Sequence, residues 1–258
     1  MKKTATVFLA GIILFLSGCG QKTETSMEAP VSTVTAAEKT AAVDPASAGI
    51  LKGRVLFEGA APEAKKLSVK GNPECAVFHA NGEISSEEVL VKDGMLKNAF
   101  VYIKEGLEKY TFPAPTEAVT VENTGCHYIP HVSGAQVNQP VNFLNNDPTL
   151  HNFHAYPKNS KPFNLGLPFQ GMKQVRKFDA SEVMVPLKCD VHPWMLGYIG
   201  ILPHPYFQVT GADGSFELKN LPAGTYTVEA WHEKLGAQTQ TVTLGPQETK
   251  QLEFKFSA

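Results

Sequence analysis

The sequence has little that would bind nucleic acid and no segment long enough to cross a membrane as a helix. Its 258 residues include 23 Lys and Arg against 25 Asp and Glu, for a formal net charge of -2. No basic surplus is available to neutralise phosphates, so nucleic acid is excluded as an expected partner. No apolar run reaches the roughly 18 residues of a membrane-spanning helix. Hydrophobic residues make up 43% and charged residues 19%, which excludes a fibre and wholesale disorder.

Turn-forming residues are frequent instead. The chain has 21 Gly and 18 Pro, and such residues separate short strands more readily than long helices. The run Thr225–Trp231 alternates polar and apolar side chains, which is the period of a half-buried strand. We therefore expect an all-β protein built of sandwiches.

The N-terminal segment predicts export. Lys2 and Lys3 precede an apolar stretch over 5–16, which is the pattern of a secretory signal peptide. The Leu-Ser-Gly-Cys sequence that ends at Cys19 resembles the lipobox of bacterial lipoproteins. That resemblance implies that residues 1–18 are removed as a signal peptide and that the Cys19 thiol is lipidated. An ordinary signal peptide with a chance cysteine is the alternative.

The residues after Cys19 are expected to form a flexible linker. The linker is assigned to 19–49, where residues 20–48 contain no aromatic residue, Leu or Ile and so bury too little apolar surface to become ordered. The acyl chains would be the sole membrane attachment. Gly20, rather than Asp, follows the cysteine. By resemblance to Gram-negative lipoproteins, this implies the outer membrane of the cell envelope, facing either the periplasm or the exterior.

The C-terminal part contains regularly spaced strands. Turns at Gly211–Gly214 and Asn220–Gly224 separate them, and glycine supplies the positive φ that such turns need. The run from Val209 to Gly236 resembles the carboxypeptidase regulatory-like domain, a transthyretin-like β-sandwich. Modules of this family are mostly structural.

The family also has two earlier strands, and the sequences beginning at Gly53 and Asn98 fill these positions. The resemblance therefore implies that 50–111 and 205–258 form one small sandwich. The residues between them, 112–204, are expected to be an inserted second domain.

The inserted segment carries side chains suited to metal binding. Cys189, His192 and Met195 have the spacing C-x2-H-x2-M, and His151 lies upstream of them. Two imidazoles, a thiolate and a weak thioether are the ligand set of a blue-copper electron-transfer site. Sulfur favours Cu(I) and imidazole favours Cu(II), so little has to move when an electron arrives or leaves.

These residues resemble the cupredoxins, in particular the amicyanin- and plastocyanin-like type 1 copper proteins. The resemblance implies a Greek-key β-sandwich over 112–204 that holds one type 1 copper. It assigns the metal ligands to His151, Cys189, His192 and Met195, and implies that Asn152 pins the cysteine loop by hydrogen bonding.

The same resemblance implies an electron exit patch at His192, Pro193 and Trp194, with Phe153 as a further member. A small apolar docking face of this kind gives complexes that dissociate fast, as electron shuttling requires.

Other interpretations of the ligand residues stay open. Cys189 and His192 alone fit a buried thiol beside a surface imidazole, and zinc is the rival metal, although Met is a poor zinc ligand. His154 is the rival first ligand, but in a strand it lies on the opposite face from His151. Met172 and Met184 are rival axial ligands that lie off the loop.

The remaining cysteines have two interpretations. If lipid takes Cys19 and metal takes Cys189, then Cys75 and Cys126 are free to form the expected disulfide in an oxidising compartment. The alternative is a second metal site built from Cys75, Cys126, His79, His127 and His131.

The expected function is that of an exported, membrane-anchored type 1 copper protein carrying single electrons. Its expected partner is a redox protein, with a c-type cytochrome as the leading candidate. Copper storage or delivery without electron transfer is the alternative, as is, more remotely, a surface adhesion module with a vestigial site. An enzyme is not expected: the sequence has no HxxE or HExxH motif and no repeated HxH motif, so a metallopeptidase, copper oxidase or nitrite reductase lacks its further ligands.

Overall fold

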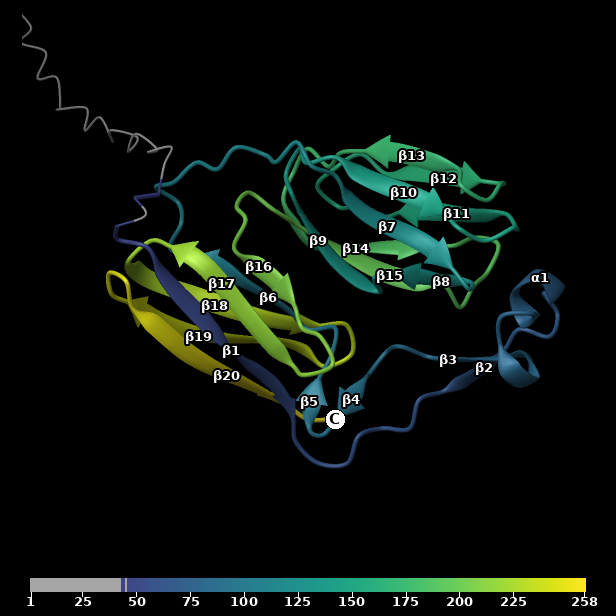
Figure 1. Ribbon diagram of the computed structural model, residues 1–258, viewed down its shortest axis with the longest axis horizontal. Coiled ribbons are helices and arrows are strands. Elements are labelled where there is room, and N and C mark those ends of the chain that lie inside the picture. The colour runs from purple at the N-terminus through teal and green to yellow at the C-terminus, as the bar shows by residue number, and fades with distance from the viewer. Residues whose placement is uncertain (1–42, 45) are drawn as a thin grey trace, which may run out of the picture. The chain divides into compact units, whose positions relative to one another are not determined.

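The chain is built almost entirely of strands, and the prediction of an all-β protein is confirmed. The computed structural model describes residues 43–44 and 46–258, shown as ribbon in Figure 1. The signal peptide, Cys19 and most of the expected linker lie outside the described residues. Among the described residues, no helix has the length and apolar character needed to cross a membrane.

Two sheets form the first sandwich, which we call the outer sandwich. One has the order β17-β1-β5-β4 with β20 paired to β1, and the other has the order β16-β6-β18-β19. The strands are β1 (Gly49–Phe57), β4 (Val91–Lys92), β5 (Met95–Leu96), β6 (Phe100–Glu105), β16 (Phe207–Val209), β17 (Ser215–Leu221), β18 (Gly224–His232), β19 (Gly236–Leu244) and β20 (Thr249–Phe256).

The alternation in β18 produces the outer core. Tyr226, Val228 and Ala230 are buried in one apolar cluster together with residues of both sheets. Burying such side chains contributes roughly 1.5–3 kcal/mol for each large one. The core therefore joins segments from both ends of the described chain, because β1 runs parallel to β20.

Strands β7 to β15 form a separate sandwich, which we call the inserted sandwich. Its sheets have the orders β13-β10-β7-β8 and β12-β11-β14-β15-β9. The strands are β7 (Val119–Thr124), β8 (His127–Ile129), β9 (Val132–Gln136), β10 (Val141–Asn145), β11 (His151–Ala155), β12 (Phe163–Leu167), β13 (Lys173–Arg176), β14 (Glu182–Lys188) and β15 (Leu196–Leu202). The outer sandwich resumes after it, where β16 pairs antiparallel with β6.

An excursion between β1 and β4 differs from the continuous sandwich expected over 50–111. Residues 58–90, here called the arm, contain β2 (Lys66–Ser68), α1 (Pro73–Ala76), a 3-10 turn (Ala80–Gly82) and β3 (Glu83–Ser85). β2 pairs only with β3, as Figure 1 shows. The Cys75–Cys126 disulfide, with Cα atoms 5.7 Å apart, ties α1 to the turn between β7 and β8.

Aromatic side chains of the outer sandwich pack on backbone atoms of glycine residues in the inserted sandwich. A Cβ at Gly200 would lie 2.5 Å from Phe100 Cζ, and a Cβ at Gly134 would lie 2.4 Å from Phe207 Cε2. The Phe100 and Phe207 rings stack with centroids 5.5 Å apart. Glycine is therefore required at both positions for this approach, since any side chain would collide with a ring.

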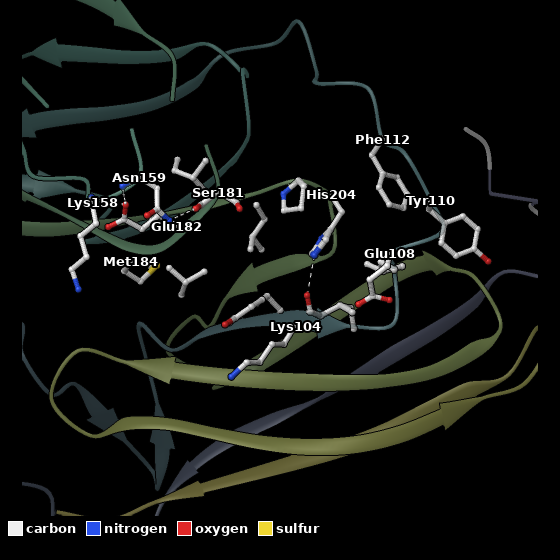
Figure 2. A pocket seen from close by; sticks show the side chains of 17 residues that line it. Lys104, Glu108, Tyr110, Phe112, Lys158, Asn159, Ser181, Glu182, Met184 and His204 are labelled. Carbon is white, nitrogen blue, oxygen red and sulfur yellow. Dashed lines mark hydrogen bonds between the residues drawn. The ribbon is translucent and has the colours of Figure 1, made fainter. Parts of the chain in front are cut away.

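A groove of about 720 Å³ runs beside this contact. Figure 2 shows Lys104 and Glu108 on one side and Lys158 and Glu182 on the other, with His204 donating a hydrogen bond from Nε2 to the Ile103 carbonyl at 2.9 Å. None of the expected metal ligands lines the groove.

Candidate metal centre

The C-x2-H-x2-M stretch forms a closed loop between two paired strands. Cys189 directly follows β14, and Met195 directly precedes β15. The Cys189 amide donates to the Met195 carbonyl at 3.2 Å, and the Met195 amide donates to the His192 carbonyl at 2.9 Å. The backbone thus fixes the loop by its own hydrogen bonds.

Three ligand atoms converge where this loop meets β11. His151, the first residue of β11, places Nδ1 3.0 Å from His192 Nδ1, and Cys189 Sγ lies 3.7 Å from the same His192 nitrogen. One atom from each of the three residues lies within 4.8 Å of the others. The three residues are 0%, 4% and 2% exposed for His151, Cys189 and His192, so water has little access to the convergence point.

Asp147 sets the orientation of the first imidazole. Its Oδ2 lies 2.9 Å from His151 Nε2, and its carboxylate also accepts the backbone amides of Gly125 at 2.7 Å and Cys126 at 2.8 Å. Because an ionised carboxylate only accepts, Nε2 carries a proton toward Asp147, and Nδ1 is the ring nitrogen that faces His192. The sequence pattern N-x-D-x-x-x-H-N includes this residue, but sequence reasoning assigned it no role.

Asn152 connects the ligand strand to the cysteine loop. Its Oδ1 accepts the Asp190 amide at 2.7 Å and lies 3.3 Å from Cys189 Sγ. Its Nδ2 donates to Asn164 Oδ1 at 2.7 Å and to Asp190 Oδ2 at 3.0 Å. The side chain therefore holds Cys189 beside His151 through contacts that need no metal.

The site favours a thiolate. Burial raises the pKa of the Cys189 thiol, but hydrogen bonds with His151 and His192 and with the backbone outweigh burial and lower that pKa to about 6. Burial lowers the pKa of His151, yet the Asp147 carboxylate and the Cys189 thiolate raise it overall. For Asp147, the His151 ring and the two amides outweigh burial and lower the carboxyl pKa. Asp147 and Cys189 are therefore both anionic and buried, and both lie beside the His151 imidazole. Such an environment favours binding of a cation.

These donors fit a copper ion. Metal–nitrogen bonds of about 2.0 Å and metal–sulfur bonds of about 2.3 Å place ligand atoms of one ion roughly 3 to 4 Å apart. His192 Nδ1 lies 3.7 Å from Cys189 Sγ and 3.0 Å from His151 Nδ1, which is within that range. Met195, 2% exposed, packs in the same core as Cys189. Two imidazoles, one thiolate and a thioether are the copper set, whereas structural zinc takes four firm ligands.

A second triad, Cys126, Asp147 and His151, also lies within 4.8 Å. Cys126 is bound to Cys75 in the disulfide, so this triad offers no thiolate. Cys189 is the free cysteine among the described residues.

The rival ligands lie elsewhere. His154 is directed to the Asp190 carboxylate at 3.1 Å and to the Tyr156 hydroxyl at 2.8 Å, on the other face of β11 from His151. Met184 packs against the cluster that contains Phe100, in the contact between the sandwiches, and Met172 packs at the edge of the inserted core.

The expected exit patch is only partly at the surface. Pro193 is exposed and Trp194 half-buried, but His192 is 2% exposed. Trp194 covers it: the two ring centroids are 5.2 Å apart, and the indole Nε1 donates to the Cys126 carbonyl at 3.2 Å. Phe153 does not belong to the patch, because it is 0% exposed and stacks on Tyr128 in the core.

Comparison with protein-family models identifies a part of the outer sandwich. Residues 205–257 match the family model of the carboxypeptidase regulatory-like domain. This match spans β16 to β20 of the outer sandwich. No curated protein matches the chain.

Solved structures similar to this chain include cupredoxins. A purple cupredoxin from Nitrosopumilus maritimus is 23% identical with a TM-score of 0.28, covering 32% of this chain and 98% of that one. Amicyanin from Paracoccus versutus is 20% identical with a TM-score of 0.29, covering 34% and 83%. A copper-containing nitrite reductase from Thermus scotoductus SA-01 is 24% identical with a TM-score of 0.32, covering 34% of this chain and only 23% of that one. Each likeness covers about a third of this chain, and the metal centre rests on its own geometry.

Proposed function

We propose that this protein is a type 1 copper protein that carries single electrons. His151, Cys189 and His192 would hold the ion, with Met195 as the weak axial ligand. The observation that carries the proposal is the convergence of two imidazole nitrogens and one sulfur within 4.8 Å. When bound, copper would supply a one-electron redox couple at this position.

The chain's own contacts support rapid electron exchange. Asp147 orients His151, and Asn152 together with the backbone holds the cysteine loop. Because these contacts hold the donors in place without metal, a change of valence requires little movement of the protein.

Burial favours a resident ion over copper delivery. Cys189 and His192 are 4% and 2% exposed, so an acceptor protein cannot reach the ligands without opening the loop. Delivery proteins need accessible ligands for exchange, which makes storage or delivery the weaker alternative here.

Visible and EPR spectroscopy of the copper-loaded full-length protein tests the proposal. We expect an intense band near 600 nm, as the resemblance to blue-copper proteins implies, that bleaches with ascorbate and returns on oxidation. A colourless Cu(I) protein that surrenders its metal to a chelator within minutes would instead support delivery and contradict electron transfer.

We also propose that the protein is lipid-anchored at Cys19 in the cell envelope and exchanges electrons with a redox protein, with a c-type cytochrome as the first partner to test. The lipobox-like sequence ending at Cys19 supports the anchor. Cys19→Ala should move the protein from the membrane to the soluble fraction on centrifugation. Unchanged membrane association would contradict the anchor.

A further inference from the structure

A two-residue turn between β7 and β8 lies beside the candidate metal centre. Gly125 and Cys126 form it, with φ of 61° and 57°, and a hairpin turn of the I′ type requires positive φ at both of its residues. Glycine adopts positive φ freely, whereas cysteine adopts it only where surrounding contacts determine the conformation. The contacts of Cys126 therefore indicate what this turn is held for.

The arm holds both residues of the turn. The disulfide joins Cys75 of α1 to Cys126, and the His79 ring donates a hydrogen bond from Nε2 to the Gly125 carbonyl at 2.8 Å. Both sulfurs and this nitrogen are thereby occupied, so they do not serve the alternative second metal site. Both cysteines are 0% exposed and belong to the same apolar cluster as Cys189. The arm is therefore part of the core that surrounds the proposed ligands.

The turn fixes the carboxylate that orients the first imidazole. The Gly125 amide donates to Asp147 Oδ1 at 2.7 Å, and the Cys126 amide donates to Asp147 Oδ2 at 2.8 Å. Asp147 Oδ2 lies 2.9 Å from His151 Nε2, and Cys126 Sγ is itself 3.9 Å from the same nitrogen. A carboxylate can orient an imidazole only as firmly as its own hydrogen bonds hold it, so the position of His151 depends on the turn.

The same turn supports the cover of the second imidazole. The Trp194 indole donates from Nε1 to the Cys126 carbonyl at 3.2 Å, and its ring centroid lies 5.2 Å from that of His192. His192 is 2% exposed, so the indole keeps water away from this ring. The second imidazole thus packs against a side chain that the backbone of Cys126 holds.

We propose that Cys126, locked by its disulfide to the arm, is a positioning residue for both imidazoles of the copper centre. This inference rests on the proposed function and adds to it a support that the outer sandwich supplies through its arm. The arm fixes the turn, and the turn fixes Asp147 and Trp194. These two side chains then hold His151 and His192.

The place where the disulfide ends distinguishes this role from a general crosslink. A bond that served stability alone could end on any buried residue of the inserted sandwich. Here it ends on a residue whose amide, carbonyl and sulfur each contact a different side chain of the site, namely Asp147, Trp194 and His151. The bond therefore restrains the ligand supports directly.

Hydrogen exchange of the metal-free, full-length protein with nitrogen-15-labelled histidine tests the proposal. The Nε2 proton of His151 should exchange slowly in the wild type, because it is buried and bonded to Asp147. In the Cys75→Ala, Cys126→Ala double variant it should exchange about 10-fold faster, because its hydrogen bond opens more often. The Nε2 proton of His204, bonded to a carbonyl of the outer sandwich, is the internal reference and should stay slow.

Copper binding provides the second measurement. The double variant should bind copper about 10- to 100-fold more weakly in chelator competition, the usual effect of loosening a partner of a ligating histidine. Leu51→Ala, which also lowers stability by leaving a cavity in the outer core, should keep the wild-type affinity. His79→Ala retains the disulfide but removes the other hold of the arm on the turn, and should speed His151 exchange to a smaller extent.

The opposing results are distinct. An unchanged His151 exchange rate, or equal acceleration at His151 and His204, would overturn the positioning role and leave the disulfide as a general crosslink. Should the double variant fail to fold, unchanged His151 exchange in His79→Ala would overturn it equally. A wild type without a blue band would contradict electron transfer, while the metal-free exchange result would stand.

Discussion

The two sandwiches are built from strands of similar length but bury different side chains. The outer core consists of aliphatic and aromatic residues such as Leu51, Phe216 and Phe254. The inserted core contains Cys189 and Met195, and beside them lie the buried polar residues Asn123, Asn145, Asp147, His151, Asn152 and His192.

This difference shows which of the two sandwich cores can hold a functional site. Each buried polar group needs a partner to offset its desolvation. In the inserted sandwich Asp147 contacts His151 at 2.9 Å and Asn145 donates to the Thr149 and Leu167 carbonyls at 2.8 Å, whereas the Asn123 side chain has no partner among the described residues. In the outer sandwich Tyr102 lies outside the main apolar core, in the cluster with Phe100, where it donates to Glu229 at 2.6 Å, and Lys104 pairs with Glu229 at 2.7 Å. One sandwich thus supplies a scaffold and the other a site.

The largest contrast between the sandwiches should come from Cys189→Ala. We expect complete loss of the visible copper band, because no other free cysteine is available among the described residues. The fold should survive with a cost of about 1 kcal/mol, since only a small buried group is removed. Absorption spectra and thermal melts measure both. As a control, His232→Gln removes a buried imidazole from the outer sandwich and should keep the copper band. Persistence of the band in Cys189→Ala would disprove a thiolate ligand.

Removing the Cys75–Cys126 disulfide should have the next largest effect, on the free energy of unfolding. The Cys75→Ala, Cys126→Ala double variant removes a disulfide whose two cysteines lie 51 positions apart in the sequence. The entropy of closing such a loop predicts a loss of about 4 kcal/mol in the free energy of unfolding. Urea denaturation measures it, with the oxidised wild type as the reference. An unchanged midpoint would show that the arm adds no stability through this bond.

Asp147→Asn tests the support of the first imidazole. Loss of the carboxylate should weaken copper affinity about 10- to 100-fold, the usual effect of removing a partner of a ligating histidine. Competition with a copper chelator measures the affinity. Asp190→Asn is the neighbouring control, since this exposed carboxylate contacts no proposed ligand imidazole, and equal losses in both variants would refute the orienting role of Asp147.

Acid should weaken the outer sandwich through its buried histidines. Burial lowers the pKa of His204 from 6.5 to about 4, so between these values the unfolded chain binds more protons than the folded one. The stability is therefore present above pH 6.5 and lost as pH falls toward 4. The linkage predicts a loss of about 2 kcal/mol from pH 7 to pH 5 for this group.

His204→Gln should remove that part of the pH dependence, because a glutamine amide can still donate to the Ile103 carbonyl without titrating. Urea unfolding at pH 7 and pH 5 measures the change. His154→Gln, at a half-buried histidine, serves as the comparison and should retain the wild-type dependence. A His204→Gln variant that loses as much stability as the wild type would reject the assignment.

The smallest expected effect is that of His154→Ala. Its ring faces Asp190 and Tyr156 rather than Cys189, so copper affinity and the visible spectrum should change little. Chelator competition and absorption provide the measurement. Loss of copper in this variant would reassign the upstream ligand from His151 to His154.

The sequence alone determined the features that depend on the spacing of nearby residues. Frequent turn residues and alternating strands indicate an all-β chain, because strand periodicity is a short-range property. Cys189, His192 and Met195 share one loop, so their proximity follows from their spacing. The adjacent pair His151-Asn152 completes the pattern, and the carboxypeptidase regulatory-like run identifies the second sandwich.

Only the tertiary structure decided how distant segments meet. The cysteine count predicts the Cys75–Cys126 disulfide as one of two interpretations. No local pattern indicates that the arm leaves the outer sandwich to form it, that Asp147 faces His151, or that Trp194 covers His192. Such contacts depend on how sheets pack and where loops return, and these are set by the burial of whole faces rather than by neighbouring residues.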